Sequence, residues 1–235
     1  MSGGLKRVLA AVADVVFPAV CEVCGDSLVE GEDVLCLKCY SEIPRTNSHR
    51  DDFGIVHQRL ASTLPIEKAA SFFNYFRDNP YARLIQKAKY NSLPRYATWL
   101  GKNYAAEIAS DGFFDDIDIL VPVPLNRWKL LRRGYNQSEE VAKGVAEVTR
   151  LPILNILKAR RHSSQTAKGA FERWLNTQNV YTFADDTSRI ENRHVLLIDD
   201  VITTGATILA CGKAIHDASP STRLSVLSIG ITRLL

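Results

Sequence analysis

The stretch VLLIDDVITTGAT, from Val195 to Thr207, joins an apolar run, two adjacent acids and a small hydroxyl-rich turn. A continuous apolar run of this length is typical of a strand buried on both faces of a parallel sheet. In such sheets, ligands bind beyond the carboxyl ends of the strands, which is where Asp199 and Asp200 lie. The stretch therefore predicts a buried strand with a binding site at its end.

The turn after the two acids predicts a phosphate site. It opens a helix, whose first backbone N–H groups lack partners and whose N-terminus is electropositive. Gly205 removes a side chain that would block close approach, and the hydroxyls of Thr203, Thr204 and Thr207 add donors. Because two carboxylates repel a phosphate, we expect them to face a ribose 2′,3′-diol or a magnesium ion with its waters. The predicted ligand is a sugar 5-phosphate; the alternative is that the acids only cap the helix.

The rest of the chain alternates between apolar runs and amphipathic segments, which predicts an α/β fold with a parallel sheet flanked by helices. Asn136 is placed to cap one helix, with Glu139 three residues later. We expect strands over 69–76, 117–124, 194–199 and 224–231, and helices over 81–90, 97–110, from 136 onward, and over 206–218.

Four of the five cysteines form two C-x-x-C pairs, Cys21 with Cys24 and Cys36 with Cys39. Two such pairs aim four thiolates at one point, which is the ligand set of a structural Zn²⁺ site. Four protein ligands leave no open position for catalysis. The alternatives are a pair of disulfides or an iron–sulfur cluster. Cys211 stands alone on a predicted helix and is expected to be a small core residue.

Length and composition fit one substantial core with a small appended module, since 235 residues are 46% hydrophobic. We expect an amphipathic helix and the four-cysteine finger over 1–45, a linker over 46–65 and the α/β domain over 66–235. Asp14 interrupts the N-terminal apolar run and Val20 is too large for a cleavage site, so we do not expect a secretion signal. No segment is long enough to span a bilayer, and the expected location is the cytoplasm.

The net charge is only +3, but basic residues far outnumber acidic ones between positions 127 and 173. This excess indicates an anionic partner, either small phosphates or a nucleic-acid backbone. The alternative is a solvated basic surface.

Val195–Thr207 resembles the 5-phosphoribosyl-1-pyrophosphate (PRPP) binding motif of type I phosphoribosyltransferases. Three further features are similar to the ComF family, also called the GntX-like or competence-protein phosphoribosyltransferases. They are the four-cysteine finger after Phe17-Pro18, VPVPLNRWKLLRRGYNQSEEVA, and KARRHSSQTAKGAFERWLN. Val16 stands where that family often has Leu.

The resemblance implies a cytoplasmic phosphoribosyltransferase that uses PRPP and magnesium and is linked to the DNA-uptake machinery. Asp199 and Asp200 would hold the ribose hydroxyls as catalytic residues, and the segment from residue 158 to 174 resembles a mobile loop that closes over PRPP. The implied PRPP contacts are Asp199, Asp200, Thr203, Thr204, Gly205, Ala206, Thr207, Val123, Pro124, Arg132 and Arg133. The acceptor is not indicated; Trp99, Tyr104 and Phe113 are candidates to line its pocket or to belong to the core.

Two other functions stay open at this point. A single-stranded DNA-binding accessory protein would use Trp128, Tyr135 and Trp174, which are interleaved with arginines, for base stacking and phosphate pairing. A PRPP sensor would bind the ligand without turnover.

Overall fold

The computed structural model describes residues 19–51, 54–60, 63–76, 78–90, 93–160 and 180–232. The chain folds as two compact units, residues 1–44 and 45–235. The amphipathic helix predicted near the N-terminus lies outside the described residues. In the described part of the chain, no helix is both long and apolar enough to cross a bilayer.

The described part of the first unit, residues 19–44, forms the short helix α2 (Leu37–Ser41). Its N-cap is Cys36, whose Sγ accepts a hydrogen bond from the Cys39 N–H at 3.5 Å. An isolated antiparallel bridge joins Val20 and Ser27 in the segment that precedes it. The chain therefore turns back on itself around the first cysteine pair.

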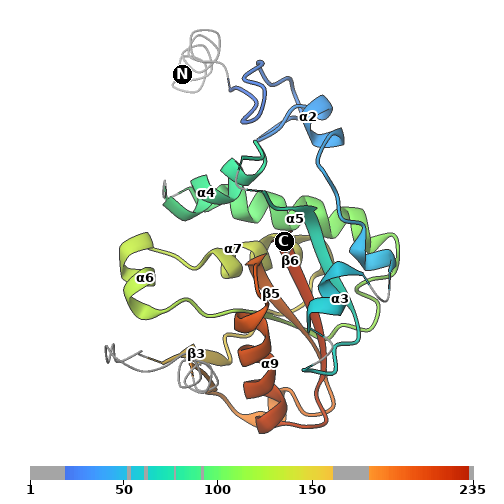
Figure 1. Cartoon of the computed structure of the whole chain (residues 1–235), viewed down its shortest axis with the longest axis vertical. Helices are drawn as coiled ribbons and strands as arrows, with labels where there is room; N and C mark the ends of the chain where they lie inside the picture. The colour runs from blue at the N-terminus through green and yellow to red at the C-terminus, as the bar shows by residue number, and fades with distance from the viewer. Residues whose placement is uncertain are drawn as a thin grey trace, which may run out of the picture. The chain divides into compact units, whose positions relative to one another are not determined.

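The second unit is built on a four-stranded parallel sheet in the order β1-β6-β5-β2 (Figure 1). The strands are β1 (Ala69–Asn74), β2 (Ile119–Pro122), β5 (His194–Ile202) and β6 (Arg223–Ile231). All three neighbouring pairs are parallel, which confirms the predicted fold class. Strand β5 continues beyond the predicted end at Asp199, because its pairing with β6 extends to Ile202 opposite Ile231.

Helices cover both faces of the sheet because its buried side chains alternate between them. Val195 and Leu197 join a core that includes Val56 and Ile208. Those two residues come from α3 (Ile55–Leu60) and α9 (Ala206–Ala218). The opposite face is covered by α4 (Ala82–Tyr90), α5 (Arg95–Ala109) and α7 (Gln137–Thr149). Cys211 is fully buried on α9, as predicted.

Three segments differ from the sequence expectations. Helix α6 (Arg127–Arg133) was not predicted, because it buries none of its residues and so carries no core-facing apolar stripe. Between 46 and 65, where a linker was expected, the chain forms the 3-10 turn η1 (Ser48–Arg50) and α3, whose Val56 and Leu60 are fully buried. A further 3-10 turn, η2 (Thr187–Arg189), precedes β5.

A small antiparallel sheet pairs β3 (Leu157–Ala159) with β4 (Tyr181–Phe183). The segment from residue 158, expected to form a mobile loop, therefore begins within a sheet, where Lys158 and Ala159 pair with Thr182 and Tyr181. The remainder of the predicted mobile loop, 161–174, lies outside the described residues.

Helices α5 and α7 approach each other closely enough to exclude a side chain where they meet. A Cβ at Gly101 would lie 2.3 Å from the carbonyl oxygen of Val141, and a Cβ at Gly144 would lie 2.1 Å from that of Thr98. This close packing fixes α7, whose first turn reaches the end of β5 through Ser138.

We predict that Gly144→Ala lowers the free energy of unfolding by about 1–3 kcal/mol, because overpacking outweighs the better helix propensity of alanine. The matched control is Gly212→Ala on α9, whose new Cβ would come too close only to the end of the flexible Leu64 side chain, at 2.6 Å, and would make ordinary contacts with Leu224 and Leu197. Denaturant unfolding of both variants checks the prediction, and equal stability of the two variants would contradict it.

Candidate functional site

Asp199 and Asp200 end the apolar part of β5, and their side chains have different partners. Asp199 is 8% exposed. Its Oδ1 accepts hydrogen bonds from Ser138 Oγ at 3.0 Å and from the Asp200 N–H at 2.8 Å. The Asp200 carboxylate pairs with Lys89 Nζ on α4 at 2.8 Å. The two acids are thus held by different helices.

A cavity of about 210 Å³ lies at this end of the sheet and contains both acids. Three cationic side chains, Lys89, Lys129 and Arg133, face it together with the two carboxylates. This mixture suits a ligand that carries both anionic groups and hydroxyl donors. The cavity is lined by Lys89, Val123, Pro124, Leu125, Asn126, Lys129, Arg133, Asn136, Gln137, Ser138, Tyr181, Asp199, Asp200, Val201 and Thr207.

The structure brings part of the predicted residue set to this cavity. Asp199, Asp200, Thr207, Val123, Pro124 and Arg133 line it, whereas Arg132, Thr203, Thr204, Gly205 and Ala206 do not. Arg132 is exposed on α6. Thr203, Thr204 and Ala206 are exposed on the turn that leads into α9.

The structure explains the glycine at position 205 differently from the sequence expectation. It adopts a left-handed φ of +83°, and a Cβ there would lie 2.8 Å from Leu60 Cδ2. Glycine is therefore required by the backbone conformation and by the packing of α3. Close approach of a ligand is not the reason, because the missing side chain would point at Leu60.

The backbone of Val123, in the wall that follows β2, is already hydrogen-bonded within the chain. The Val123 N–H donates to the Ile198 carbonyl at 2.9 Å, and the Val123 carbonyl accepts from Asn136 Nδ2 at 2.9 Å. Pro124 has no N–H. The Asn136 Oδ1 also accepts from the Ser138 N–H at 3.2 Å, which confirms the predicted cap of α7. Val123 and Pro124 therefore have no free N–H group to offer a ligand.

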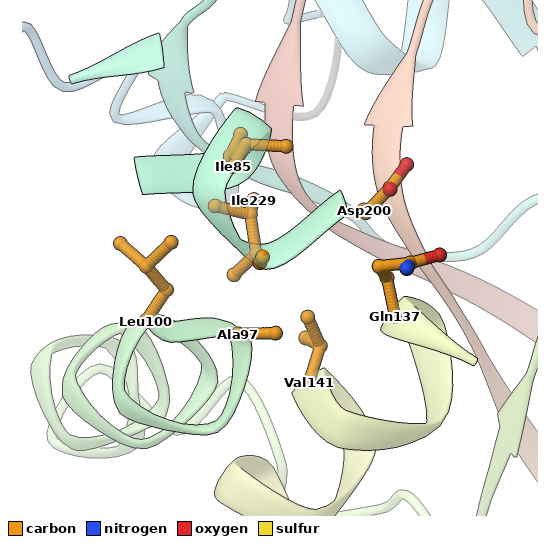
Figure 2. A pocket seen from close by; sticks show the side chains of 8 residues that line it. Ile85, Ala97, Leu100, Gln137, Val141, Asp200 and Ile229 are labelled. Atoms are coloured by element: carbon orange, nitrogen blue, oxygen red, sulfur yellow. The ribbon is translucent and has the colours of Figure 1, made fainter. Parts of the chain in front are cut away.

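Lys89, Gln137 and Ser138 are among the cavity residues that were not predicted as ligand contacts from the sequence. Figure 2 shows Gln137 and Asp200, which also line the cavity, among the apolar side chains of a smaller pocket. Gln137 is 2% exposed, its Oε1 accepts from Arg133 Nη1 at 2.8 Å, and its Nε2 has no hydrogen-bond partner among the described residues. The cavity joins these residues to segments far apart in the sequence, so no local pattern reports their place in it.

Two aromatic candidates for an acceptor pocket belong to the core. Tyr104 is 2% exposed and stacks on Phe72 with ring centroids 4.7 Å apart, and Phe113 is 5% exposed. Neither lines the cavity that contains the two acids.

Burial and the neighbouring negative charge of Asp200 raise the pKa of Asp199 to about 7. The hydrogen bonds from the Asp200 N–H and Ser138, and the charge of Lys89, act in the opposite direction. A carboxyl group that lines a polar cavity and has a pKa near neutral pH is typical of a functional site.

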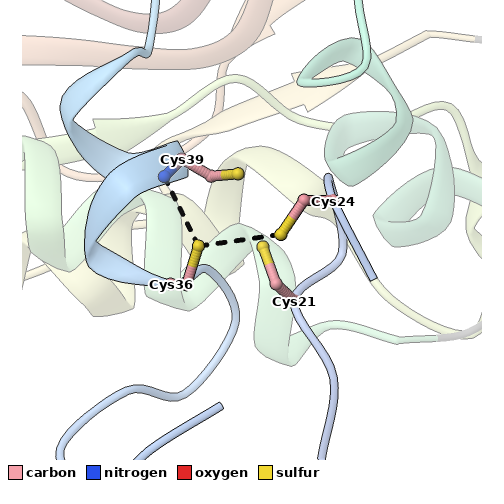
Figure 3. A group of neighbouring side chains, drawn as sticks. All are labelled: Cys21, Cys24, Cys36 and Cys39. Carbon is pink, nitrogen blue, oxygen red and sulfur yellow. Dashed lines mark hydrogen bonds between the residues drawn. The ribbon is translucent and has the colours of Figure 1, made fainter. Parts of the chain in front are cut away.

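The four predicted zinc ligands lie together in the first unit (Figure 3). Their sulfur atoms are all within 4.8 Å of one another, the Cys24 and Cys36 sulfurs are 3.7 Å apart, and all four are free thiols. Burial opposes ionisation of Cys21, but hydrogen bonds from the backbone of Cys24 and Cys36 lower its pKa to about 6. The cluster is compatible with a zinc site, which needs thiolates at this spacing.

A second group of possible metal ligands, Glu67, Asp116 and His194, lies near the N-terminal ends of the strands. Its carboxylates are already paired with the chain's own cations, Lys68 and Arg223. We therefore interpret it as an ion-pair network.

Comparison with curated proteins identifies relatives of the chain. It is 34% identical over 101 residues to competence protein F of Haemophilus influenzae, a match that covers 42% of this chain and 44% of that protein. It is 19% identical to competence protein ComFC of Bacillus subtilis over 97% of this chain and 96% of that protein. DNA utilization protein YhgH of Escherichia coli K12 is 24% identical over 80% of each chain.

Its homologues are competence and DNA utilization proteins. This confirms the predicted resemblance to the ComF family. No family model matches the chain.

Among solved structures, phosphoribosyltransferases are similar to the chain. The glutamine PRPP amidotransferase of Bacillus subtilis complexed with ADP and GMP has a TM-score of 0.40 at 22% identity, over 56% of this chain and 25% of that one. The purine phosphoribosyltransferase of Pyrococcus horikoshii has a TM-score of 0.35 at 12% identity, over 57% of this chain and 86% of that one.

The raised pKa of Asp199 predicts a pH-dependent effect of Asp199→Asn on stability. Between about pH 4 and pH 7 the unfolded chain has lost the proton that folded Asp199 keeps, so the wild-type fold becomes less stable as the pH rises. Asparagine can keep both hydrogen bonds to Oδ1 without this penalty. We expect the variant to be more stable than the wild type by about 1–3 kcal/mol at pH 8, with the difference vanishing near pH 4. Denaturant unfolding from pH 4 to pH 8 measures this, and a wild type at least as stable at pH 8 would contradict it.

Proposed function

We propose that the protein binds PRPP with magnesium and transfers its phosphoribosyl group to an acceptor, with release of pyrophosphate, in DNA uptake or utilization. The observation that carries the proposal is the cavity at the end of β5, where Asp199 and Asp200 face cations from α4 and α6. The sequence similarity of Val195–Thr207 to PRPP-binding motifs supports the identity of the ligand. The names of the relatives support the link to DNA.

The two halves of the proposed ligand have different partners. In this proposal the ribose hydroxyls donate to the Asp199 and Asp200 carboxylates, and the 5-phosphate binds the backbone N–H groups and hydroxyls of the 203–207 turn. Arg133 and Lys129 face the pyrophosphate from α6. Arg132 is exposed on the same helix and does not line the cavity. The planar arginine guanidinium can donate two parallel hydrogen bonds to pyrophosphate oxygens, which the ammonium group of lysine cannot do in the same fixed geometry.

Lys89 and Gln137 extend the site beyond the sequence motif. A ribose or cation that binds the Asp200 carboxylate competes with Lys89, which holds that carboxylate at 2.8 Å. Gln137 brings a buried amide donor to the same place, and Arg133 fixes the orientation of its amide. We propose that both side chains contact the bound ligand.

The proposed reaction breaks the bond between ribose C1 and the pyrophosphate oxygen and forms a bond from C1 to the acceptor nucleophile. The bonding electrons leave with pyrophosphate. The carboxylates at the ribose stabilise the positive charge that develops on the sugar, and the cations at the cavity wall stabilise the leaving group. Magnesium, when bound with PRPP, supplies further positive charge to the pyrophosphate, and the carboxylates of Asp199 and Asp200 are oxygen ligands of the kind that it prefers.

Replacing both acids tests the proposal. We expect Asp199→Asn with Asp200→Asn to lower PRPP affinity by at least about a hundredfold, because several charge-assisted hydrogen bonds are lost together. Titration calorimetry with PRPP and magnesium measures it. Asp217→Asn, which removes an exposed carboxylate on α9, is the control. Unchanged affinity in the double variant would contradict the proposed site.

We also propose that Cys21, Cys24, Cys36 and Cys39 hold a structural Zn²⁺ in the N-terminal module. Cys36 has two roles in the structure, since its sulfur lies in the cluster and also caps α2. Losing one of four thiolates leaves an incomplete tetrahedral site.

Cys36→Ser is therefore expected to reduce zinc content from about one equivalent per chain to a small fraction and to destabilise the first unit. Cys211→Ser, at the cysteine outside the cluster, is the control for loss of a thiol. Metal analysis of the purified proteins measures this. Native protein that purifies with almost no metal and does not take up zinc would contradict the zinc proposal.

A second candidate function, binding of single-stranded DNA, is favoured by the surface of α6. Trp128 is 63% exposed and Leu131 is 68% exposed, between Arg127, Lys129 and Arg132. An exposed indole among cations suits base stacking with phosphate pairing. Tyr135 is less suited to stacking, because it is partly buried and donates a hydrogen bond to the Ala88 carbonyl. Trp174 lies outside the described residues.

If α6 binds single-stranded DNA, Trp128→Ala should weaken binding by about 1–3 kcal/mol. Arg132→Ala should reduce the slope of log affinity against log salt by about 0.7. Neither residue lines the cavity, so PRPP affinity should not change in either variant. Fluorescence anisotropy with a labelled oligonucleotide over a range of salt concentrations tests this, and binding that is insensitive to salt would count against it.

A further inference from the structure

Arg59 on α3 binds the backbone at the ends of the two central strands. Its Nη1 donates to the Thr203 carbonyl at 2.5 Å and to the Ile202 carbonyl at 3.5 Å. Its Nη2 donates to the Thr232 carbonyl at 2.6 Å. The Thr232 N–H in turn donates to the Ile202 carbonyl at 3.0 Å. One guanidinium therefore holds carbonyls from both strand ends, including those of the segment that follows Asp200.

These hydrogen bonds decide which way the neighbouring N–H groups point. In a trans peptide the C=O and N–H bonds point in opposite directions, and the described part of the chain has no cis peptide. Because the Ile202 and Thr203 carbonyls point at Arg59, the N–H groups of Thr203 and Thr204 point away from it. Both threonines are exposed. The turn thus presents consecutive backbone donors on its exposed side, which is an arrangement that binds anions.

The next part of the turn is also fitted against α3. Gly205 packs on Leu60, the residue after Arg59, and a Cβ at Gly205 would lie 3.5 Å from Arg59 Cγ. Helix α9 begins directly after this glycine. The conformation of the whole turn up to the helix therefore depends on α3.

The charge of Arg59 has no carboxylate partner in the described part of the chain. Its Nη groups donate to neutral carbonyls, and its Nε has no hydrogen-bond partner there. Burial lowers the pKa of Arg59, and no neighbouring carboxylate acts in the opposite direction. A partly buried cation without an anionic partner, beside a turn that exposes N–H groups, favours an anion at that turn.

We propose that Arg59 is a positioning residue for the 5-phosphate of the ligand: it aligns the N–H groups of the 203–207 turn and adds positive charge behind them. This inference rests on the proposed function and deepens it. It adds α3 to the elements that form the phosphate half of the site, which are otherwise β5 and α9. The competing interpretation is that Arg59 only attaches α3 to the sheet.

The test measures the two halves of the site with separate probes. Ribose 5-phosphate reports the phosphate turn, and pyrophosphate with magnesium reports the wall formed by α6 and α7. Calorimetry is carried out on the full chain with wild type, Arg59→Met, Arg59→Lys and the control Lys213→Met, which removes an exposed cation on α9. We expect Arg59→Met to lose about tenfold or more in ribose 5-phosphate affinity, and pyrophosphate affinity to stay within about twofold. Arg59→Lys keeps the positive charge but not the two-pronged guanidinium. Its affinity for ribose 5-phosphate should therefore lie between those of the wild type and Arg59→Met.

Each other outcome overturns the proposal in a recognisable way. Unchanged ribose 5-phosphate affinity in Arg59→Met means that the alignment of the turn does not depend on Arg59. Equal losses for both probes, together with a lower melting temperature, mean that Arg59 supports the fold in general. If the wild type binds neither probe, the proposed function itself fails, which is distinct from failure of the Arg59 proposal alone.

Discussion

Burial of the Asp199 carboxylate at the end of an apolar strand is the constraint on which the rest of the site depends. A buried carboxylate is costly unless it is hydrogen-bonded or protonated. The first turn of α7 supplies one donor through Ser138, and the backbone of Asp200 supplies another. Asp200, one residue later, is neutralised by Lys89 on α4. Two acids can therefore stand side by side because each has its own set of partners.

The same constraint explains why α4, α5 and α7 form one packed layer. Ser138 reaches Asp199 only if the start of α7 is held against the end of β5, and the close packing of α5 on α7 at Gly101 and Gly144 keeps it there. On the other face, α3 holds the turn after β5 through Arg59 and Leu60. The strand end is thus fixed from both faces of the sheet, which is what a preorganised binding site requires.

The sequence was most informative where structure is local. The apolar run and the small-residue turn predicted β5 and the start of α9, and the spacing of the cysteines predicted their cluster. Helix α6 was missed because it has no buried face, and its cap at Asn126 is a weak signal without one. The linker expected over 46–65 contains α3, because its two buried residues, Val56 and Leu60, are too few to produce a recognisable period.

The partners of the acids could not be predicted for a different reason. Lys89 lies on the polar side of α4, and nothing in its own segment separates it from Lys87 two residues earlier. Gln137 and Ser138 were expected only as the start of a capped helix. Their position beside Asp199 and Asp200 follows from the order of the strands and from the packing of α7 on the sheet, which link segments about 60 residues or more apart.

The central claim, that a phosphosugar binds at the end of β5, is tested most directly by backbone amide NMR of the full chain titrated with PRPP and magnesium. The account predicts saturable shifts at the amides of 199–207 and of 133–138, with those of the distant ion-pair network around Asp116 and Arg223 unchanged. Saturable shifts confined to other parts of the chain, or no shifts at all, would contradict it.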